Sequence, residues 1–301
     1  MTHNKFIDIE RIRDDNVSGF EKGDHICIQE KIDGANAAVR YDPETDSVIA
    51  QSRRNILDSK NDLRGFLQWS QTLDKELLRS VLGEDLIAYC EWLVPHTVRY
   101  PEECYDRAYF YDVYDTASQE YLPQDKAKEI FAQLGFTYVP VFYEGEFVSW
   151  EHCMGFVGRT ALGGEYGEGI VVKNQTKLND PDESRPFYVK IVDEKFKETI
   201  SVRVRLTDSE RLRTMAEDKA LAETIVTEAR VVKLLHKFVD DGILPENWGA
   251  AEMPVISKNL TKAVYEDCIK EEPDTAAQIN NFGKVANGIA MRIARRIMEE
   301  R

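Results

Sequence analysis

The chain has 301 residues, of which 43% are hydrophobic and 31% charged, the balance of a water-soluble globular protein with room for two domain cores. Its formal net charge of −15 argues against tight, nonspecific binding to polynucleotides, because phosphate binding normally requires a basic surface. No apolar run reaches membrane-spanning length, the N-terminus lacks a signal-peptide pattern, and the five cysteines show no Cys-x-x-Cys spacing. We therefore expect a cytoplasmic protein with reduced thiols and no structural zinc.

The first two thirds of the chain mix strand and helix patterns. Apolar and polar residues alternate, or apolar and aromatic residues cluster, in segments that predict strands over residues 26–30, 35–40, 47–52, 86–92 and 108–114, with a further extended segment at 139–142. Helical spacing predicts helices over residues 63–82 and 124–134, the second ending at Gly135. A glycine-rich loop spans residues 158–169, and because no Gly-Lys-Ser/Thr follows it, a Walker-type phosphate loop is excluded.

After residue 200 the pattern predicts helices only. A capping box at Thr207-x-x-Glu210 opens one helix towards Ala222, an apolar stripe from Ile225 to Phe238 predicts another, and two more are expected over 256–269 and from 275 to the C-terminus. We therefore predict an α+β fold. Residues 1–203 form a domain with mixed and antiparallel sheets, and residues 204–301 form a small all-helical domain.

Lys31 stands out as a candidate nucleophile. It follows the strand pattern of residues 26–30 and precedes Asp33 and Gly34, and a glycine allows a sharp turn there. A lysine amine is nucleophilic only when unprotonated, and desolvation or nearby cations lower its ordinary pKa of about 10.4. The alternative is an ordinary lysine at a strand edge.

Six segments, in order, resemble the motifs of the covalent nucleotidyltransferases, the superfamily of polynucleotide ligases and capping enzymes. Lys31-Ile32-Asp33-Gly34 resembles its Lys-x-Asp-Gly signature, and the later matches are Ser52-Arg53-Arg54, Glu91 within residues 86–92, Tyr109 to Val113, Glu168 to Lys173, and Tyr188 to Lys190 with Lys195-Phe196. The chain is most similar to the phage-type RNA ligase 2 family, because residues 229–243 resemble its helical C-terminal domain. DNA ligases and capping enzymes have an oligonucleotide-binding barrel in that position.

This resemblance implies an adenylyltransferase domain of the ATP-grasp-like ligase type and a reaction in three steps. Lys31 attacks the α-phosphate of ATP, the adenylate passes to a 5′-phosphate, and a 3′-hydroxyl then attacks and releases AMP. The implied cofactors are ATP and Mg²⁺, with Mn²⁺ as a possible substitute, and the implied partner is RNA with 5′-phosphate and 3′-hydroxyl ends. No membrane or protein partner is implied.

The resemblance also assigns roles to individual residues. The implied catalytic lysines are Lys31, Lys173 and Lys190, with Lys173 at the α-phosphate, and Glu168 is the implied metal ligand. The implied ATP-binding residues are Glu30, Lys31, Asn36, Arg53, Glu91, Tyr111, Lys173 and Lys190.

Two of these assignments have structural alternatives that the sequence leaves open. A carboxylate such as Glu91 in an apolar strand needs a partner, either a ribose hydroxyl or an internal salt bridge. Tyr111 would stack on adenine, or it is a core tyrosine. For the second motif Arg53 is preferred, although Arg54 also fits.

The last motif departs from the family pattern at Val192. RNA ligase 2 proteins have two lysines at positions i and i+2, which face the same side of a strand. Here the first is Lys190 and the second position is Val192. Either Lys195 or Lys197 takes the place of the missing cation, or one step of the reaction is slow.

Other functions remain open at this point. One is ligation of DNA or hybrid nicks, since strand selection depends on 2′-hydroxyl contacts and helix shape. Another is noncatalytic nucleic-acid binding with the same fold, and a third is nucleotide transfer to a protein or small molecule. The C-terminal cations are expected to bind the RNA backbone, unless they are solvated helix faces: Arg230, Lys233, Lys237, Lys258, Lys262, Arg292, Arg295 and Arg296.

Overall fold

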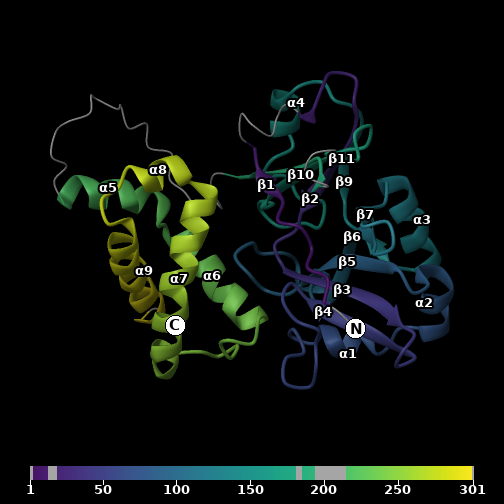
Figure 1. Cartoon of the computed structure of the whole chain (residues 1–301), viewed down its shortest axis with the longest axis horizontal. Coiled ribbons are helices and arrows are strands. Elements are labelled where there is room, and N and C mark those ends of the chain that lie inside the picture. Colours follow the sequence, from purple (N-terminus) through teal and green to yellow (C-terminus); the bar gives the residue numbers. More distant parts are fainter. Residues whose placement is uncertain (1–2, 13–18, 181–184, 194–214, 300–301) are drawn as a thin grey trace. The chain divides into compact units, whose positions relative to one another are not determined.

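The computed structural model describes residues 3–12, 19–180, 185–193 and 215–299 (Figure 1). The chain divides into two compact units, Met1–Asp193 and Glu194–Arg301. The expected domain boundary at residues 203/204 and the expected capping box at Thr207 fall outside the described residues and stay predictions. The mixed α+β class and the helical character of the second unit are confirmed by the described elements.

The first sheet of the N-terminal unit has five strands and contains Lys31. Its strand order is β1 (Glu10–Arg11), β13 (Tyr188–Val192), β10 (Gly169–Asn174), β2 (His25–Lys31) and β9 (Val141–Glu146). The pairs are antiparallel, except for the parallel pair β1 and β13 at the edge. A small hairpin, β11 (Asn179–Asp180) with β12 (Arg185–Pro186), lies between β10 and β13 in sequence.

The second sheet has six strands and contains the segments of the middle motifs. Its order is β4 (Ser47–Ser52), β3 (Ala35–Asp42), β5 (Leu86–Leu93), β6 (Arg107–Asp115) and β7 (Glu120–Tyr121), with β8 (Thr137–Tyr138) parallel to β6. The expected strands at 35–40, 47–52, 86–92 and 108–114 are all present in this sheet.

One face of the six-stranded sheet is covered by helices. Alternate residues of its strands, including Ala37, Ala88 and Cys90, pack against apolar side chains of α1 (Phe66–Ser70), α2 (Lys75–Leu82) and α3 (Gln124–Leu134). The single helix expected over 63–82 is instead two. The Asp74 carboxylate accepts a hydrogen bond from Leu77 N–H and so starts a new helix in the middle of that segment.

The five-stranded sheet also buries one face. Its residues Ile28, Ile170 and Ile191 form a core with Phe20 and with Cys153 of α4 (Trp150–Met154). The side chains that alternate with these, among them Gln29 and Lys173, point to the other face and contact residues of the six-stranded sheet and α3. The functional motifs therefore meet between the two sheets.

The C-terminal unit has its own hydrophobic core. Its helices are α5 (Met215–Ile225), α6 (Glu228–Asp240), α7 (Met253–Glu271), α8 (Pro273–Ala277) and α9 (Phe282–Glu299). The apolar stripe predicted along α6 faces this core, and the chain turns after α6 at Gly242, where φ is 68°. The last expected helix begins later, because α8 and α9 are separate.

At least four of the cations expected to bind RNA are already in ion pairs within this unit, and one of these is Lys262, whose Nζ is 3.6 Å from Glu266 Oε1. Arg230 is fully buried on α6, with its Nε 3.1 Å from Asp267 Oδ2, so its expected contact with an RNA backbone is wrong. Arg292 pairs with Glu223 and Arg296 with Glu228 on the surface.

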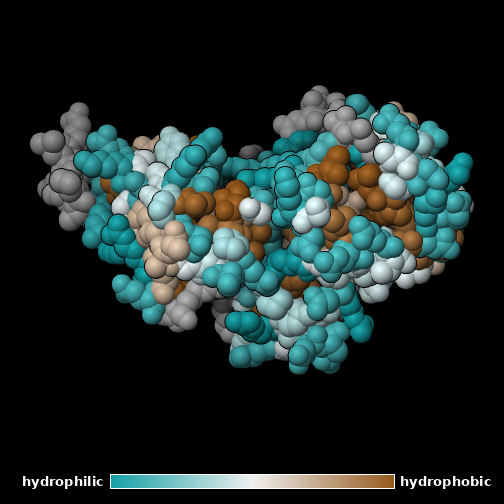
Figure 2. Space-filling model, turned by 90° about the horizontal axis from the view of Figure 1, so that it is seen from below, coloured by the Kyte–Doolittle hydropathy of each residue, from teal (hydrophilic) through white to brown (hydrophobic). Residues whose placement is uncertain are grey.

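The surface is mostly polar with scattered apolar patches, as the face drawn in Figure 2 shows. Exposed large hydrophobic residues include Val148 and Met154 in the first unit and Tyr265 and Ile269 in the second. Within the described ranges, we find no helix with the length and hydropathy needed to cross a membrane.

Candidate active site

Lys31 and Glu168 form an ion pair where β2 ends and β10 begins. Lys31 is the last residue of β2, and its register partner on β10 is Gly169, which directly follows Glu168. Lys31 Nζ contacts a carboxylate oxygen of Glu168, and the two side chains are 22% and 3% exposed respectively. Strand pairing thus brings the first and fourth motifs together, with the lysine as the accessible partner of a buried carboxylate.

Two glycines allow the close packing of this region. A Cβ at Gly169 would lie 2.2 Å from Ile191 O of β13, and a Cβ at Gly34 would lie 2.6 Å from Trp92 O of β5. Real Cβ atoms do not approach a carbonyl oxygen so closely, so any larger residue would push these strands apart. Gly34 therefore allows the turn after Lys31 to approach β5 closely where β3 begins.

Asp33 holds the loop that follows β5 against Lys31. Its Oδ2 accepts hydrogen bonds from the backbone N–H groups of Thr97 and Val98, each at 2.8 Å, and its Oδ1 is 3.6 Å from His96 Nδ1. Sequence reasoning assigned no role to His96, since a single histidine in a loop has no distinctive spacing. The structure places it next to the Lys31 motif.

Glu91 belongs to the same site. It lies on β5 opposite Asn36 of β3, and one of its carboxylate oxygens accepts a hydrogen bond from Gly34 N–H at 3.1 Å. Burial raises the pKa of Glu91 to about 7, the charge of Lys31 counteracts this rise, and that of Glu168 adds to it. No ion pair to Glu91 is formed within the described part of the chain, so the internal salt bridge considered above has no partner there.

The raised pKa of Glu91 leads to a prediction about stability and pH. The folded state holds a proton on Glu91 up to about pH 7, whereas the unfolded chain releases it near the ordinary value of 4.5. Ionisation of Glu91 in the folded state therefore lowers the free energy of unfolding. This destabilisation is absent below pH 4.5, grows as the pH rises, and is complete above pH 7. We expect Glu91→Gln to raise the melting temperature at pH 8 by about 2–6 °C, with the gain disappearing towards pH 4.5.

The matched control for this measurement is Glu103→Gln, because Glu103 is exposed. Thermal melts of the two variants and the wild type across this pH range provide the comparison. A gain for Glu91→Gln that does not change with pH would contradict the pKa assignment.

Tyr111 lies on β6 and contacts Asn36, the register partner of Glu91. Asn36 Nδ2 donates a hydrogen bond to its hydroxyl, and the Phe6 ring packs edge-on against it with centroids 5.1 Å apart. Lys173 Nζ is 5.6 Å from the centroid of the Tyr111 ring. Tyr111 is half-buried, so both a core contact and an exposed portion are present, and adenine stacking stays a prediction.

Lys190 shares the face of Lys31. Its neighbours Val189 and Ile191 point into the core on the opposite side of the sheet, so the side chain of Lys190 points between the two sheets. Val192, two residues on, is 6% exposed and lies in one row with Gly169 and Lys31. The position without a cation is therefore two strands from the candidate nucleophile. Lys195 and Lys197, its possible replacements, lie outside the described residues.

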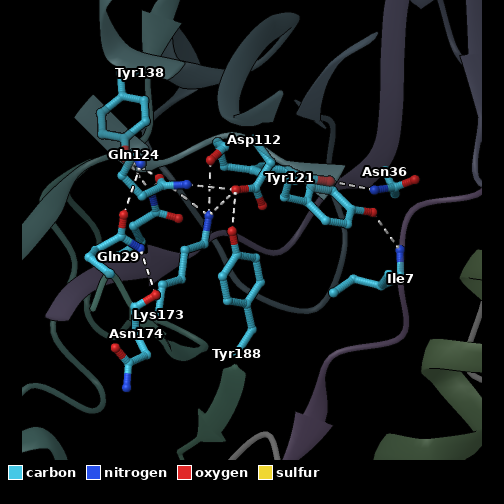
Figure 3. A network of polar contacts seen from close by, with 12 residues as sticks. Ile7, Gln29, Asn36, Asp112, Tyr121, Gln124, Tyr138, Lys173, Asn174 and Tyr188 are labelled. Atoms are coloured by element: carbon cyan, nitrogen blue, oxygen red, sulfur yellow. Dashed lines mark hydrogen bonds and ion pairs between the residues drawn. The ribbon is translucent and has the colours of Figure 1, made fainter. Parts of the chain in front are cut away.

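Lys173 is placed differently from the expectation. Its ammonium group is 2.8 Å from Asp112 Oδ1 and donates to Tyr111 O at 2.9 Å, and its side chain is 1% exposed (Figure 3). Burial lowers the pKa of Lys173 and raises the pKa of Asp112, while the attraction between the two counteracts both shifts. This amine is enclosed and paired with a carboxylate, and its expected contact with the α-phosphate stays a prediction.

Asp112 is the centre of a network that joins the two sheets. Its Oδ1 accepts hydrogen bonds from Gln124 Nε2 at 2.7 Å and from the Tyr188 hydroxyl at 3.1 Å, and Gln29 Nε2 donates to Gln124 Oε1 at 2.6 Å (Figure 3). The sequence analysis assigned Asp112 no role, although an acid directly after Tyr111 in an aromatic strand indicates a buried, paired carboxylate.

Glu30 also departs from the expected role. As the strand neighbour of Lys31, its side chain points to the opposite face, where it is 3% exposed and accepts a hydrogen bond from Ala161 N–H at 2.9 Å. Burial raises its pKa. The Glu30 carboxylate thus contacts the glycine-rich loop on the face opposite to the Lys31 side chain, and the expected contact of Glu30 with ATP stays a prediction.

Arg53 and Arg54 follow the last residue of β4. Arg53 pairs with Asp8 of the N-terminal segment, whereas the Arg54 side chain is exposed. Asp8 thereby becomes a second residue of this region that sequence reasoning missed. The choice between the two arginines for an ATP contact stays a prediction.

The carboxylate of Glu168 is a suitable ligand for a divalent metal ion at this site. Among the residues that the structure describes, no cluster of three or more His, Cys, Asp or Glu side chains could hold a metal ion. Mg²⁺ in phosphoryl-transfer sites is typically held by one or two carboxylates together with substrate phosphates and water. The nearly buried carboxylate of Glu168, next to Lys31, matches that type of ligand set.

Comparison with known proteins identifies the family. An RNA ligase family model matches residues 24–192, which is more than half of the chain. The chain therefore belongs to the RNA ligase family, and the expected family is confirmed. The narrower similarity to phage-type RNA ligase 2 stays a prediction. A search of curated proteins finds no match.

Similar solved structures include RNA ligases of Naegleria gruberi. An apo variant has a TM-score of 0.47 and 18% identity, over 64% of this chain and 56% of that one. The form with PPi has a TM-score of 0.46 and 16% identity, over 64% and 57%. A variant with ATP and Mn has a TM-score of 0.45 and 16% identity, over 63% and 56%. This chain thus covers little more than half of each of these proteins.

Proposed function

We propose that the protein is an ATP-dependent RNA ligase that joins 3′-hydroxyl and 5′-phosphate RNA ends at nicks in a duplex. The observation that supports this most is the accessible Lys31 amine beside the carboxylates of Glu168 and Glu91, in a chain of the RNA ligase family. A cytoplasmic location belongs to the same proposal. It is supported by the five cysteines, all within the described residues, none of which forms a disulfide.

The proposed reaction starts with a bond from Lys31 to ATP. The lone pair of Lys31 Nζ attacks the α-phosphorus, the bond to pyrophosphate breaks, and the amine loses a proton to solvent. Mg²⁺, held by Glu168 and phosphate oxygens, would neutralise the charge that builds up on the phosphates. We expect Lys190 to contact phosphate oxygens and the Glu91 carboxylate to accept a hydrogen bond from a ribose hydroxyl. This is supported by the position of Lys190 on the face of Lys31 and of Glu91 beside Gly34.

The adenylate then moves to RNA. An oxygen of the 5′-phosphate attacks the adenylate phosphorus and frees Lys31, and the 3′-hydroxyl of the other end attacks the 5′-phosphorus and expels AMP. Both steps need the RNA backbone positioned beside Lys31, which is a matter of phosphate contacts rather than of base reading.

A substrate panel tests the proposed function. Full-length protein is incubated with ATP, Mg²⁺ and 5′-phosphorylated nicks in duplex RNA, duplex DNA and RNA/DNA hybrids, and the joined product is measured. We expect RNA nicks to be sealed fastest. Fastest sealing of DNA would reassign the protein as a DNA or hybrid nick ligase. Binding without joining of any substrate would leave a noncatalytic nucleic-acid-binding protein.

A truncated chain tests how the two units share the work. Every proposed ATP contact lies in the first unit, so a fragment ending at Leu206 is expected to form lysyl-adenylate at close to the full-length rate. Sealing of a 5′-phosphorylated nick should fall by about 10²-fold or more, because the fragment loses the phosphate contacts of the helical unit, and full-length sealing should weaken steeply with salt. The Lys31→Ala fragment is the control. A fragment that seals nicks as well as the whole chain would remove this role from the helical unit.

A further inference from the structure

The N-terminal segment, residues 3–12, contacts both sheets of the first unit. At its start, Asn4 O accepts hydrogen bonds from Gln51 Nε2 at 2.7 Å and from the Tyr89 hydroxyl at 2.8 Å, both in the six-stranded sheet. Phe6 is then buried against Tyr89 and Tyr111, with ring centroids 5.0 and 5.1 Å away. The segment ends as β1 at the edge of the five-stranded sheet, so it runs from one sheet to the other (Figure 1).

The register of β1 places Arg11 beside Lys190. The two strands are parallel, Arg11 is the partner of Lys190, and Ile12 N–H donates to Lys190 O at 3.3 Å. Ile12 packs into the core on the far side of the sheet, together with Ile191. Since successive residues of a strand point to opposite faces, the side chain of Arg11 is on the face of Lys190 and Lys31.

We infer that Arg11 is a phosphate-binding residue of this site and acts as the second cation beside Lys190. The inference rests on the proposed function. The second motif position, Val192, is an almost buried aliphatic residue, whereas Arg11 is half-buried in the strand next to Lys190. A guanidinium group keeps its charge at all physiological pH values and can bind two phosphate oxygens at once. β1 thereby restores a pair of cations on this face.

The ligand of Arg11 is a phosphate group, which either ATP or the 5′-end of RNA can provide. The two sources are separated by the step that slows. Contact with ATP predicts slow formation of lysyl-adenylate with unimpaired sealing of a nick that is already adenylylated. Contact with the RNA 5′-phosphate predicts normal lysyl-adenylate formation and slow transfer of the adenylate to RNA.

The test compares Arg11→Gln and Arg11→Lys with Arg185→Gln in the full-length chain. Arg185 is the matched control, because it contacts Glu10 and Asp8 O of the same segment and its loss removes the same charge. We expect Arg11→Gln to slow one of the two steps by about 10²–10³-fold, as for a lost charge-stabilising donor. Arg11→Lys should retain activity to within about tenfold, and Arg185→Gln should stay near the wild-type rate.

A second substitution introduces a cation at Val192, the position that lacks one. If Arg11 provides the second charge, Val192→Lys should leave the rates of the wild type unchanged but should speed up the slow step of Arg11→Gln. An accelerating effect of Val192→Lys in the wild type would mean that the cation is truly absent. The inference is also overturned if Arg11→Gln slows neither step, or if Arg185→Gln slows the same step equally.

Failure of the proposed function gives a different result. If the wild type itself forms no lysyl-adenylate, the ligase proposal falls, and the role of Arg11 is decided by titration calorimetry with ATP and with a 5′-phosphorylated RNA. In that case a loss of affinity of about tenfold for either ligand in Arg11→Gln, but not in Arg185→Gln, supports the phosphate contact. Unchanged affinities for both ligands would overturn it.

Discussion

Lys31→Ala is expected to remove covalent labelling of the protein by ATP completely. In the wild type, incubation with α-labelled ATP and Mg²⁺ should leave label on the denatured chain, and added pyrophosphate should reverse it. The amine of Lys31 is partly exposed and contacts the buried carboxylate of Glu168, and it is the atom that forms the proposed bond. Denaturing electrophoresis provides the measurement.

The control for this experiment is Lys60→Ala, since Lys60 is exposed in a loop and should label normally. A Lys31→Ala protein that still carries label would rule out this nucleophile. Label from GTP but not from ATP would indicate a capping-type enzyme.

Removal of Asp112 is expected to have the largest effect on stability. Asp112→Asn leaves the ammonium group of Lys173 buried without its counter-charge, which should lower the free energy of unfolding by about 3–5 kcal/mol. Lys173→Met should also destabilise, because the Asp112 carboxylate then loses its partner. The double variant Lys173→Met with Asp112→Asn should recover part of the loss, because no buried charge is then left unpaired and the asparagine oxygen can still accept hydrogen bonds from Gln124 and Tyr188.

Urea unfolding of the single and double variants measures this coupling directly. The same proteins, assayed for labelling by ATP, separate the two roles considered for Lys173. A Lys173→Met protein with full stability but no labelling would support the expected α-phosphate contact. Losses of less than about 1 kcal/mol in both single variants would mean that the ion pair does not hold the sheets together.

The sequence predicted the main strands of the six-stranded sheet, because their residues alternate or form apolar and aromatic clusters. The resemblance gave Lys31 and Glu168 roles in one reaction, and the structure pairs their side chains. The break between α1 and α2 was missed because Asp74 is a helix cap only if the preceding residues leave the helix. Such a choice depends on packing against the sheet and is not visible in local spacing.

The placement of Lys173 and Glu30 was not predictable from the motifs. Both residues stand in strands, and a strand sequence gives the alternation of side chains but not which neighbour each one meets. The partner of Lys173 comes from a strand 61 residues earlier in the chain, Asp112 on β6. The role of the N-terminal segment was missed for the same reason, because β1 is only two residues long and owes its register to β13.

The ion-paired network around Asp112 has a mechanical consequence for the space between the sheets. Side chains from β2, β10, β13, β6 and α3 are tied together there in a buried, hydrogen-bonded cluster, and such clusters are rigid. Glu168 lies just before β10, at the other end of that strand from Lys173, but on β2 Lys31 is only two residues from Gln29 of the network. The rigid cluster therefore fixes the separation of the two sheets close to the reacting amine of Lys31.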